Sequence, residues 1–492
     1  MSAVPIRPSC ADIIAMYHRM KGEDVFFLTG TDEHGQKVQQ AAEKNNLSPA
    51  EHCDIYAERF QELWSYFNIS NDDFIRTTEA RHIRVVQDLM QRLYDLGEIY
   101  KDDYEGWYSV ADEMFVSEKD HAEGKYRDVR RISETNYYFR MSAYRQRLID
   151  HIREHPGFIR PENRRNEILG FLKQPLKDLC ISRPKARLAW GIELPFDEDY
   201  VTYVWFDALL NYISAPGYGA DEEKFRRYWP AVHMIGKDIL TTHCVYWPSM
   251  LMAAGIELPE AIFAHGWWTS EGKKMSKSLG NFIDLETIQS HCDHVGKDAY
   301  RYFMAKEGPL FSDADFSKER FYHTYNMDLA NDFGNLVNRI FKLIKKYYGG
   351  KVPGPGTLQE NEQEMKKAAE AVRDAVMEHL EALDVNAMVS EIIAYVSSVN
   401  RYLEQKEPWK LAKSDPDAAG RVLYAGLASL RFSAALLYPV LPQKTAEFFS
   451  MLNSGEKPGR IVQWEDLSPG TELDEMKALF PRFDMKRLET GD

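Results

Sequence analysis

The residues best suited to chemistry in this sequence form the run Lys274-Met275-Ser276-Lys277-Ser278, within GKKMSKSLGN. Two lysines three positions apart, two serine hydroxyls and flanking glycines can wrap around a polyphosphate. Their ammonium groups can follow the negative charge that builds up on a pyrophosphate leaving group. A Lys/Ser stretch taken alone is more often a solvated loop, but this one follows a predicted strand and the pair Trp267-Trp268.

A second candidate site lies just after the apolar run VFFLTG at 25–30. This run predicts a buried strand, and α/β folds place their ligands at the carboxyl ends of such strands. Asp32 follows in T-D-E-H-G and is the candidate for binding a charged group. Its neighbours Glu33 and His34 either orient Asp32 or form a solvated turn, and the sequence leaves both interpretations open.

Aromatic residues gather in YVTYVWFDALLNYI (200–213) and HMIGKDILTTHCVYWPSMLM (233–252). Aromatic rings of this kind can line a pocket, although each ring taken singly is more often part of a core. Tyr203, Trp205, Tyr212 and Trp247 supply this area. Gly236-Lys237-Asp238 forms a turn after an apolar run, at the carboxyl end of a predicted strand, where α/β folds bind ligands.

The run at 274–278 resembles the second signature of the class I aminoacyl-tRNA synthetases, and its surroundings resemble the methionyl-tRNA synthetase family. FFLTGTDEHGQKV (26–38), LKDLCISRPKARLAWGIELP (176–195) and the two aromatic blocks are similar to that family's blocks, in its order. With KEPWKLAK (406–413), the resemblance spans about residue 11 to residue 445. It implies ATP-dependent ligation of L-methionine to tRNA(Met) through methionyl-adenylate, with release of AMP and diphosphate. Mg²⁺ would enter with ATP.

The resemblance also implies roles for single residues, carried over by position. The expected catalytic residues are Lys274, Lys277 and Arg183. For Arg183, the alternative interpretation is a surface salt bridge. The expected methionine-binding residues are Asp32, Trp205, Ala208, Tyr212, Ile239 and His243. The expected ATP-binding residues are Gly236, Asp238, His265, Lys274, Met275, Ser276, Lys277 and Ser278. Leu209 stands where some relatives have proline, so the pocket floor is expected to differ slightly.

The sequence departs from the family in its first signature, H-I-G-H, because MSAVPIRPSC stands directly before ADIIAMYHRM and no H-x-G-H occurs. The first strand of the nucleotide fold is expected to be missing as well. A misplaced start or a spliced gene is the simplest explanation. The alternative is a non-catalytic tRNA- or methionine-binding relative that has lost the histidine signature. A ligase for leucine, valine or isoleucine is disfavoured, since the chain has no room for a large editing domain.

The segment 99–136 differs from many relatives in its metal chemistry. It contains no cysteine and only His121, whereas many relatives carry cysteine knuckles there. We therefore expect the zinc-free type of the enzyme, with no structural zinc.

Nucleic-acid contact is predicted for one face of a helix near residue 340. Arg339, Lys342 and Lys346 fall at i, i+3 and i+7, although lysines that merely face water would show the same pattern. Trp409 follows Pro408 and is flanked by lysines, so it is well placed to stack on a base. The family uses the matching tryptophan at the anticodon, and Asn338 is the weaker candidate for a base edge.

Composition limits the remaining possibilities. The chain has 492 residues and a net charge of −15, so any contact with nucleic acid must come from a local basic face. Five scattered cysteines and the lack of a membrane span or import signal predict a reduced, cytoplasmic protein without membrane attachment. We expect a monomer.

The sequence pattern and the family resemblance together predict the fold that positions these residues. It is an α/β fold with a doubly wound parallel, Rossmann-type sheet, an inserted small subdomain and an α-helical bundle. Aromatic and β-branched residues at 99–136 predict short antiparallel strands. A break at 349–359 interrupts a helical region from Tyr325 to Tyr438. The expected domains are 1–98, the first half of the catalytic fold; 99–170, the insertion; 171–323, the second half with the lysine loop; 324–470, the anticodon-binding domain; and 471–492, a tail.

Overall fold

A computed structural model describes residues 6–109, 114–116, 118–270, 272–274, 283, 285–308 and 310–490 of the chain. The chain forms two compact units, each assembled from separate stretches of sequence. The sheet unit comprises Leu28–Glu62 and Asn71–His265. The helical unit comprises Met1–Phe27, Leu63–Ser70 and Gly266–Asp492.

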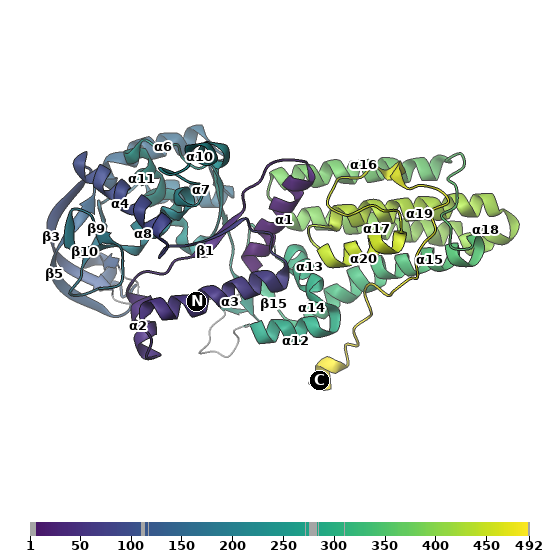
Figure 1. The fold of residues 1–492 in the computed structure, drawn as a ribbon, viewed down its shortest axis with the longest axis horizontal. Coiled ribbons are helices and arrows are strands. Elements are labelled where there is room, and N and C mark those ends of the chain that lie inside the picture. The colour runs from purple at the N-terminus through teal and green to yellow at the C-terminus, as the bar shows by residue number, and fades with distance from the viewer. Residues whose placement is uncertain are drawn as a thin grey trace. The chain divides into compact units, whose positions relative to one another are not determined.

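Parallel strands flanked by helices form the centre of the sheet unit (Figure 1). Strand β1 (Leu28–Thr31) pairs with β2 (Asp73–Arg76), while β11 (Val232–Gly236) pairs with β12 (Ala261–His265) and β12 with β6 (Ile159–Arg160). The predicted parallel α/β fold is confirmed, although its strands lie in two sheets rather than one. The helices of this part of the chain are α2 (Gln36–Lys44), α3 (Pro49–Phe67), α4 (Ala80–Asp95), α6 (Arg145–Glu154), α7 (Glu162–Phe171), α8 (Val204–Leu209), α9 (Asn211–Ser214), α10 (Glu222–Tyr228) and α11 (Trp247–Ala254).

Strand β1 differs from the buried strand predicted at 25–30. It begins at Leu28, and the residues from 25 to 31 are half-buried or exposed. Within the described residues β1 has a strand neighbour on one side only, which leaves its side chains partly open. Gly30 lies opposite Ile75 of β2, and a Cβ atom at Gly30 would stand 2.1 Å from the Ile75 carbonyl oxygen. Only glycine fits at this position.

The insertion is an antiparallel sheet, as the sequence predicts. Strand β3 (Ile99–Ser109) pairs along its whole length with β5 (Val129–Phe139), and it also pairs with β4 (Met114–Val116). Strand β7 (Leu179–Cys180) continues the sheet from β5. A smaller antiparallel sheet follows, and the remaining elements here are β8 (Ser182–Pro184), β9 (Glu193–Leu194), β10 (Asp197–Thr202), α5 (Glu118–Ala122) and η1 (Met141–Tyr144).

The core of the sheet unit is built on helices with one apolar face. Helix α4 buries Val85, Val86, Leu89, Met90 and Leu93, which recur at helical spacing. These side chains belong to the same apolar cluster as residues of α8 and α11. This packing fixes the helices that carry the polar side chains of the site.

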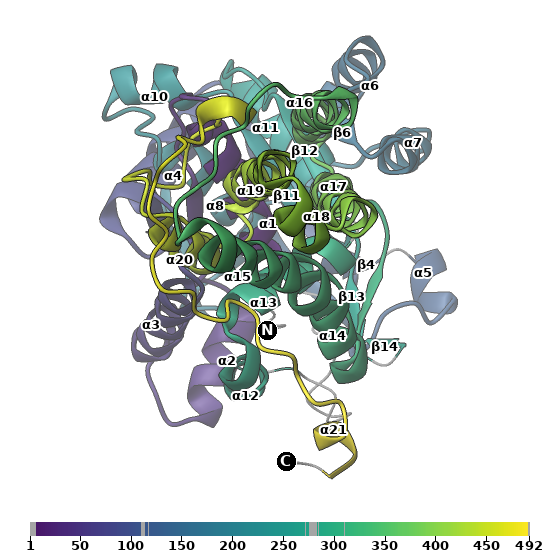
Figure 2. The same ribbon diagram turned by 90° about the vertical axis from the view of Figure 1, so that its right-hand side faces the viewer.

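Long helices make up most of the helical unit, and Figure 2 looks along several of them. Helix α19 (Pro416–Leu437) is the central one, since nearly all of its residues are buried. The predicted break is confirmed, because α15 (Asn335–Tyr348) ends before it and α16 (Glu360–Glu381) begins after it. The other elements are α1 (Ile6–Met20), β13 (Trp268–Ser270), β14 (Lys273–Lys274), α12 (Leu285–Val295), α13 (Lys297–Glu307), β15 (Ala314–Phe316), α14 (Lys318–Thr324), η5 (Tyr325–Gly334), α17 (Val385–Lys406), α18 (Pro408–Ser414), α20 (Pro442–Leu452), η6 (Trp464–Asp466) and α21 (Arg487–Thr490).

No helix in the described ranges combines the length and apolar character needed to span a membrane.

A buried ion pair joins distant segments of the helical unit. The Arg301 guanidinium on α13 lies 2.7 Å from the carboxylate of Asp12 on α1, and neither side chain is exposed. Arg301 also donates to the carbonyl oxygens of Phe67 and Pro439, at 3.1 and 2.6 Å. The other Asp12 oxygen accepts hydrogen bonds from the backbone N–H and hydroxyl of Ser70. One pair of charges therefore holds four segments together.

Removing one partner of this pair should destabilise the helical unit strongly. We expect Asp12→Ala to lower stability by about 3–5 kcal/mol, because it leaves the Arg301 charge buried without its carboxylate. The double variant Asp12→Ala/Arg301→Met should be less destabilised than Asp12→Ala alone, since it removes the uncompensated charge. Thermal unfolding followed by circular dichroism tests this order. Equal melting temperatures for Asp12→Ala and the wild type would contradict it.

Candidate functional site

The loop after β1 is held in place by a buried carboxylate. Glu33 accepts hydrogen bonds from Arg76 at 2.7 Å, from Thr31 at 2.8 Å and from Thr78. Its backbone N–H donates to the Thr77 hydroxyl. Glu33 thus ties the loop after β1 to the segment after β2, and the solvated-turn interpretation of Glu33 and His34 is wrong, since both are buried.

Asp207 on α8 joins the same loop to two helices. One carboxylate oxygen lies 2.6 Å from Nδ1 of His34, and the other lies 2.7 Å from Nε2 of His82 on α4. The second nitrogen of His82 lies 2.9 Å from the hydroxyl of Ser214 on α9. Burial favours the neutral acid, but hydrogen bonds from His34 and His82 outweigh it and lower the pKa of Asp207. Asp207 therefore stays ionised in the interior.

Asp32 lies on this loop between the fixed residues and is exposed to solvent. Protein atoms around the carboxylate, and then repulsion from Asp207, raise the pKa of Asp32 to about 6. The loop thus presents a carboxylate whose charge is only partly compensated by the protein. Such a group suits a ligand that brings a positive charge.

Tyr212, whose pKa the charge of Asp32 influences, forms a pair with a histidine. The Tyr212 hydroxyl is 2.9 Å from Nε2 of His243, whose Nδ1 is 3.0 Å from the carbonyl oxygen of Ile239. Burial lowers the pKa of His243 to about 4, so its ring is neutral at pH 7. With Nδ1 donating to the carbonyl, Nε2 accepts from Tyr212. Burial, and after it the negative charge of Asp32, raises the pKa of Tyr212.

Some of the predicted pocket residues are accessible and others belong to the core. Trp205, Tyr212 and Ile239 are half-buried, and Ala208 is buried next to them on α8. Trp247 is fully buried and donates to His233, on which Tyr212 stacks. For Trp247 the core interpretation is therefore correct, and the ring supports the pocket from behind. His243 lies on a one-turn π-helix, η3 (Thr242–Tyr246), a distortion that is frequent at functional sites.

Arg183 is buried, so the surface salt bridge considered from the sequence is wrong. Its guanidinium lies 4.4 Å from the ring centre of Tyr203 and 5.6 Å from that of Tyr108. It also donates to the carbonyl oxygen of Ser182 at 2.7 Å. These contacts fix a permanent positive charge in a small cavity that Gly35 and Tyr203 also line.

The predicted nucleotide-binding residues of the sheet unit lie at the carboxyl ends of neighbouring parallel strands. Gly236 ends β11 and is paired with His265, which ends β12. Asp238 follows on a short turn, η2 (Lys237–Ile239), and is exposed. This edge is where α/β sheets bind ligands.

The lysine loop falls in the helical unit. Lys274 lies in β14, which pairs with β13, and Met275, Ser276, Lys277 and Ser278 lie outside the described residues. The base of the loop is held by Asp315, which accepts hydrogen bonds from the Thr269 hydroxyl and the Gly272 N–H.

The predicted anticodon residues lie together on the helical unit. Trp409, at the second position of α18, is half-buried, and the Arg339 guanidinium lies 5.7 Å from its ring centre. Lys342 is exposed, whereas Arg339 forms an ion pair with Glu404 at 3.4 Å. The side-chain oxygen of Asn338 is buried and has no hydrogen-bond partner within the described chain. A partly exposed ring beside cations suits stacking on a base.

Sequence reasoning missed His82 and Asp207. Both are polar residues near apolar segments: VVQDLM (85–90) follows His82, and VWF (204–206) precedes Asp207. A polar residue that is buried in such a segment needs a hydrogen-bond partner. Their partners are far away in the sequence, so the pairing itself leaves no local signal.

Together, a parallel α/β unit with its polar residues at the strand ends, the K-M-S-K-S run and a helical unit with an exposed aromatic–cation face define a class I aminoacyl-tRNA synthetase.

Comparison with known proteins narrows this class. Residues 8–125 and 124–341 match the family described as tRNA synthetases class I (M), and residues 352–489 match the anticodon binding domain of methionyl tRNA ligase. The chain belongs to the methionine–tRNA ligase family. It is 42% identical over 490 residues to the methionine–tRNA ligase of Caldanaerobacter subterraneus subsp. tengcongensis, covering 97% of this chain and 76% of that protein. The Thermotoga maritima enzyme is 41% identical over 488 residues, covering 97% and 77%.

A solved structure is similar over nearly the whole chain. It is the Mycobacterium tuberculosis methionyl-tRNA synthetase bound by methionyl-adenylate, at a TM-score of 0.92 and 37% identity. The match covers 97% of this chain and 96% of that one.

Replacing Asp207 should damage the site more than removing its outermost partner. In Asp207→Asn, the amide offers one acceptor where two histidines need two, so we expect a melting temperature lower by several degrees and a methionine KM raised about tenfold. Ser214→Ala is the matched control, since it removes only the last hydroxyl of the chain of hydrogen bonds. Calorimetry with steady-state kinetics tests this. Equal effects of both variants would contradict the central role of Asp207.

The raised pKa of Asp32 predicts that methionine binding weakens in acid. A ligand ammonium binds the ionised carboxylate, so the Kd for methionine should rise as pH falls through about 6, by up to about tenfold per pH unit below it. In Asp32→Asn, binding should be weak and this dependence should be lost. Asp88→Asn, at an exposed carboxylate on α4, is the control. Isothermal titration from pH 5 to 8 measures both, and an unchanged profile in Asp32→Asn would contradict the assignment.

Proposed function

We propose that this chain ligates L-methionine to tRNA(Met) in two steps, through methionyl-adenylate. In the first step a methionine carboxylate oxygen attacks the α-phosphorus of ATP, and the bond to the bridging oxygen of the β-phosphate breaks. Diphosphate leaves. In the second step a hydroxyl of the 3′-terminal ribose of tRNA attacks the carbonyl carbon, and AMP leaves.

The observation that carries this proposal is the exposed Asp32 carboxylate, on a loop that Asp207 fixes through His34, together with the Tyr212–His243 pair. Asp32 offers a carboxylate for the methionine ammonium group, and the protein atoms around it, followed by repulsion from Asp207, raise its pKa to about 6. The half-buried Trp205, Tyr212 and Ile239 offer apolar and aromatic area for the thioether, with Ala208 and a neutral His243 beside them. His243 uses both ring nitrogens within the protein, which favours an apolar substituent over a charged one.

The nucleotide would lie at the carboxyl ends of β11 and β12. Gly236 and His265 end these strands, and Asp238 is exposed for contact with ribose hydroxyls. The lysine loop, with Lys274, Met275, Ser276, Lys277 and Ser278, would stabilise the charge that develops on the leaving diphosphate. Mg²⁺ would enter as part of the nucleotide substrate.

Arg183 would supply a fixed positive charge near the reacting carboxylate. Its contacts with the Tyr203 ring and the Ser182 carbonyl oxygen hold the guanidinium in a fixed position. Attack by a carboxylate, which is anionic at pH 7, needs no strong base, so positioning and charge stabilisation account for the step.

The tRNA anticodon would be read by the helical unit. The half-buried Trp409 beside the Arg339 cation supports stacking on a base, and the buried, unpartnered oxygen of Asn338 supports a hydrogen bond to a base edge. Lys342 would contact the backbone. The same proposal includes a monomer in the cytoplasm, without structural zinc.

Methionine-dependent ATP–pyrophosphate exchange tests the proposal directly. We expect exchange that is lost by at least about a hundredfold in Lys277→Ala, since that lysine stabilises the leaving group. The chain should also be measured with an added N-terminal segment that supplies a strand and H-x-G-H, which would supply two further donors to the phosphates. Exchange by neither protein, with methionine binding intact, would favour the alternative of a non-catalytic methionine- or tRNA-binding relative.

A further inference from the structure

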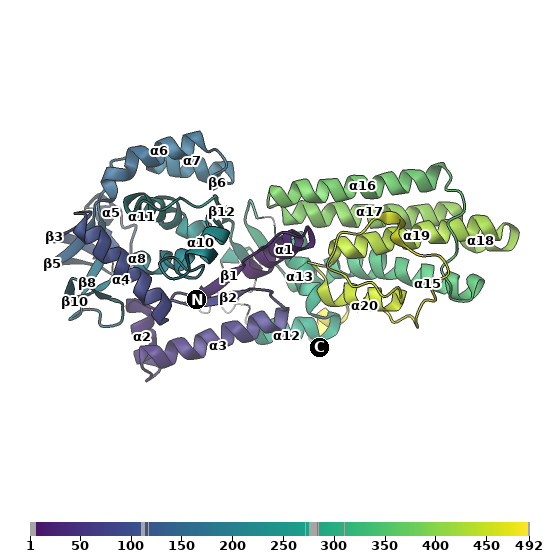
Figure 3. The same cartoon turned by 45° about the horizontal axis from the view of Figure 1, so that its top comes forward.

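Helices α6 and α7 lie side by side in the sheet unit, as Figures 1 and 3 both show. A groove of about 520 Å³ runs between them. Its polar lining consists of three cations and two amides, over a floor that includes Ile149: Arg145, Arg153, Lys173, Gln146 and Asn166. No carboxylate is among the described residues that line it.

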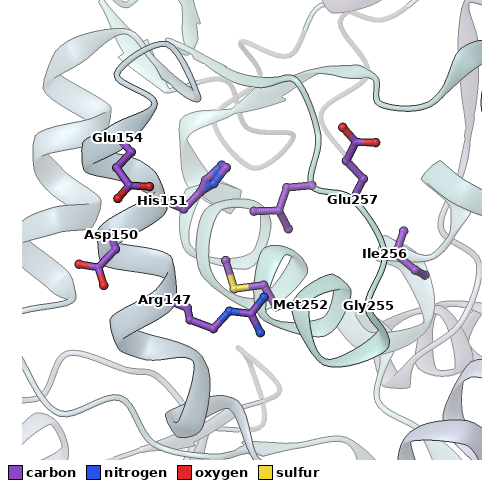
Figure 4. Close-up of a pocket in the computed structure, with 9 residues that line it drawn as sticks. Arg147, Asp150, His151, Glu154, Met252, Gly255, Ile256 and Glu257 are labelled. Carbon is purple, nitrogen blue, oxygen red and sulfur yellow. The ribbon is translucent and has the colours of Figure 1, made fainter.

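The opposite side of α6 carries the opposite charge. A second groove there, of about 540 Å³, is lined by the carboxylates of Asp150, Glu154 and Glu257, with Arg147 and His151 (Figure 4). One helix therefore separates a basic groove from a mainly acidic one. The carboxylates of α6 thus lie on one face of the helix, and the basic groove on the other face is not a mixture of both charges.

The basic groove also stands out against the whole chain. Residues 140–173 contain eight arginines and lysines and four acidic residues, whereas the chain as a whole carries a net charge of −15. Two of those acidic residues are engaged within α7, where Glu162 pairs with Arg165 and Glu167 with Arg164. Three of the eight cations, Arg145, Arg153 and Lys173, line the groove, and neither arginine of these two pairs is among them.

The cations of the groove differ in how firmly they are held. Arg145 donates to the carbonyl oxygens of Leu172 and Gln174 at the end of α7, at 2.8 and 3.2 Å. Arg153 and Lys173 are exposed, and no ion pair joins either to another described residue. Phe171, between the groove-lining residues Gly170 and Leu172, is 46% exposed.

We propose that this groove binds the phosphate backbone of the acceptor arm of the tRNA substrate. The inference rests on the proposed function, because the 3′ end of the tRNA must reach the methionine site, and that site lies in the same unit as the groove. Arg153 and Lys173 contact phosphates, Arg145 holds the groove open, and Phe171 offers a ring face to an unstacked base.

Direct binding tests this assignment without requiring catalysis. The probes are an acceptor-arm minihelix of tRNA(Met) and the isolated anticodon stem-loop, with affinity measured by fluorescence anisotropy over a range of salt concentrations. In Arg153→Gln/Lys173→Gln, minihelix affinity should fall about tenfold at about 0.1 M salt, and the slope of log K against log salt should shrink by about 2. Binding of the anticodon stem-loop should stay the same.

The matched control lies on the other face of α6. Asp150→Asn/Glu154→Gln changes the net charge by the same amount, in the opposite sense, outside the basic groove, and should alter minihelix affinity by less than twofold. An equal and opposite effect of this control would mean that net charge alone acts, and would overturn the proposal. Minihelix binding that is unchanged in Arg153→Gln/Lys173→Gln would overturn it as well.

Pyrophosphate exchange separates this proposal from the one on which it rests. Adenylate formation does not involve tRNA, so Arg153→Gln/Lys173→Gln should exchange at the wild-type rate while its KM for tRNA(Met) in aminoacylation rises. If the wild type neither exchanges nor binds any part of tRNA(Met), the proposed function fails. If the wild type is active and the KM for tRNA is the same in the variant, only the groove proposal fails.

Discussion

The geometry of the loop after β1, which carries the proposed methionine site, depends on a buried carboxylate that must remain hydrogen-bonded. Asp207 is fully enclosed, and an ionised group in such a place is stable only while its partners stay within reach. Those partners, His34 and His82, come from the loop after β1 and from α4, while Asp207 itself comes from α8. A shift of any one element would break a hydrogen bond to the Asp207 carboxylate and leave its charge buried without a partner. The three elements therefore keep one relative position.

A similar device occurs in the helical unit, where Asp12 and Arg301 are both fully buried. Replacing such pairs by apolar residues is often neutral or stabilising in other proteins, which argues that their benefit is in specifying one arrangement rather than in stability. Here each buried carboxylate, Asp207 in the sheet unit and Asp12 in the helical unit, connects segments that are distant in the sequence. The apolar cores would tolerate several packings of the same helices, whereas a buried charge with directional hydrogen bonds accepts only one.

The sequence predicted those parts of the molecule that have a local signal. The parallel strands before Asp32 and Asp238, the antiparallel insertion and the break between α15 and α16 all follow from periodicity and turn residues. No local pattern encodes the contacts between distant segments. Those contacts decide that Glu33 is buried and that Trp247 belongs to the core rather than to the pocket. The start of β1 was misplaced for the same reason, since exposure of a strand depends on which neighbours it finds.

The close approach of β1 and β2 at Gly30 has a consequence for how this site can vary. A methyl group there would collide with the backbone of Ile75, so even alanine would push the two strands apart. Asp32 lies two residues after Gly30, and Arg76 lies one residue after Ile75. The displacement caused by one added carbon would therefore reach both Asp32 and the hydrogen bond from Arg76 to Glu33. The position of Asp32, the proposed partner of the substrate ammonium group, is thus protected by steric exclusion at a residue that has no side chain of its own. Under the proposed assignment, variants that change substrate specificity are therefore expected at Trp205 or Ile239 rather than in the strand that carries the loop.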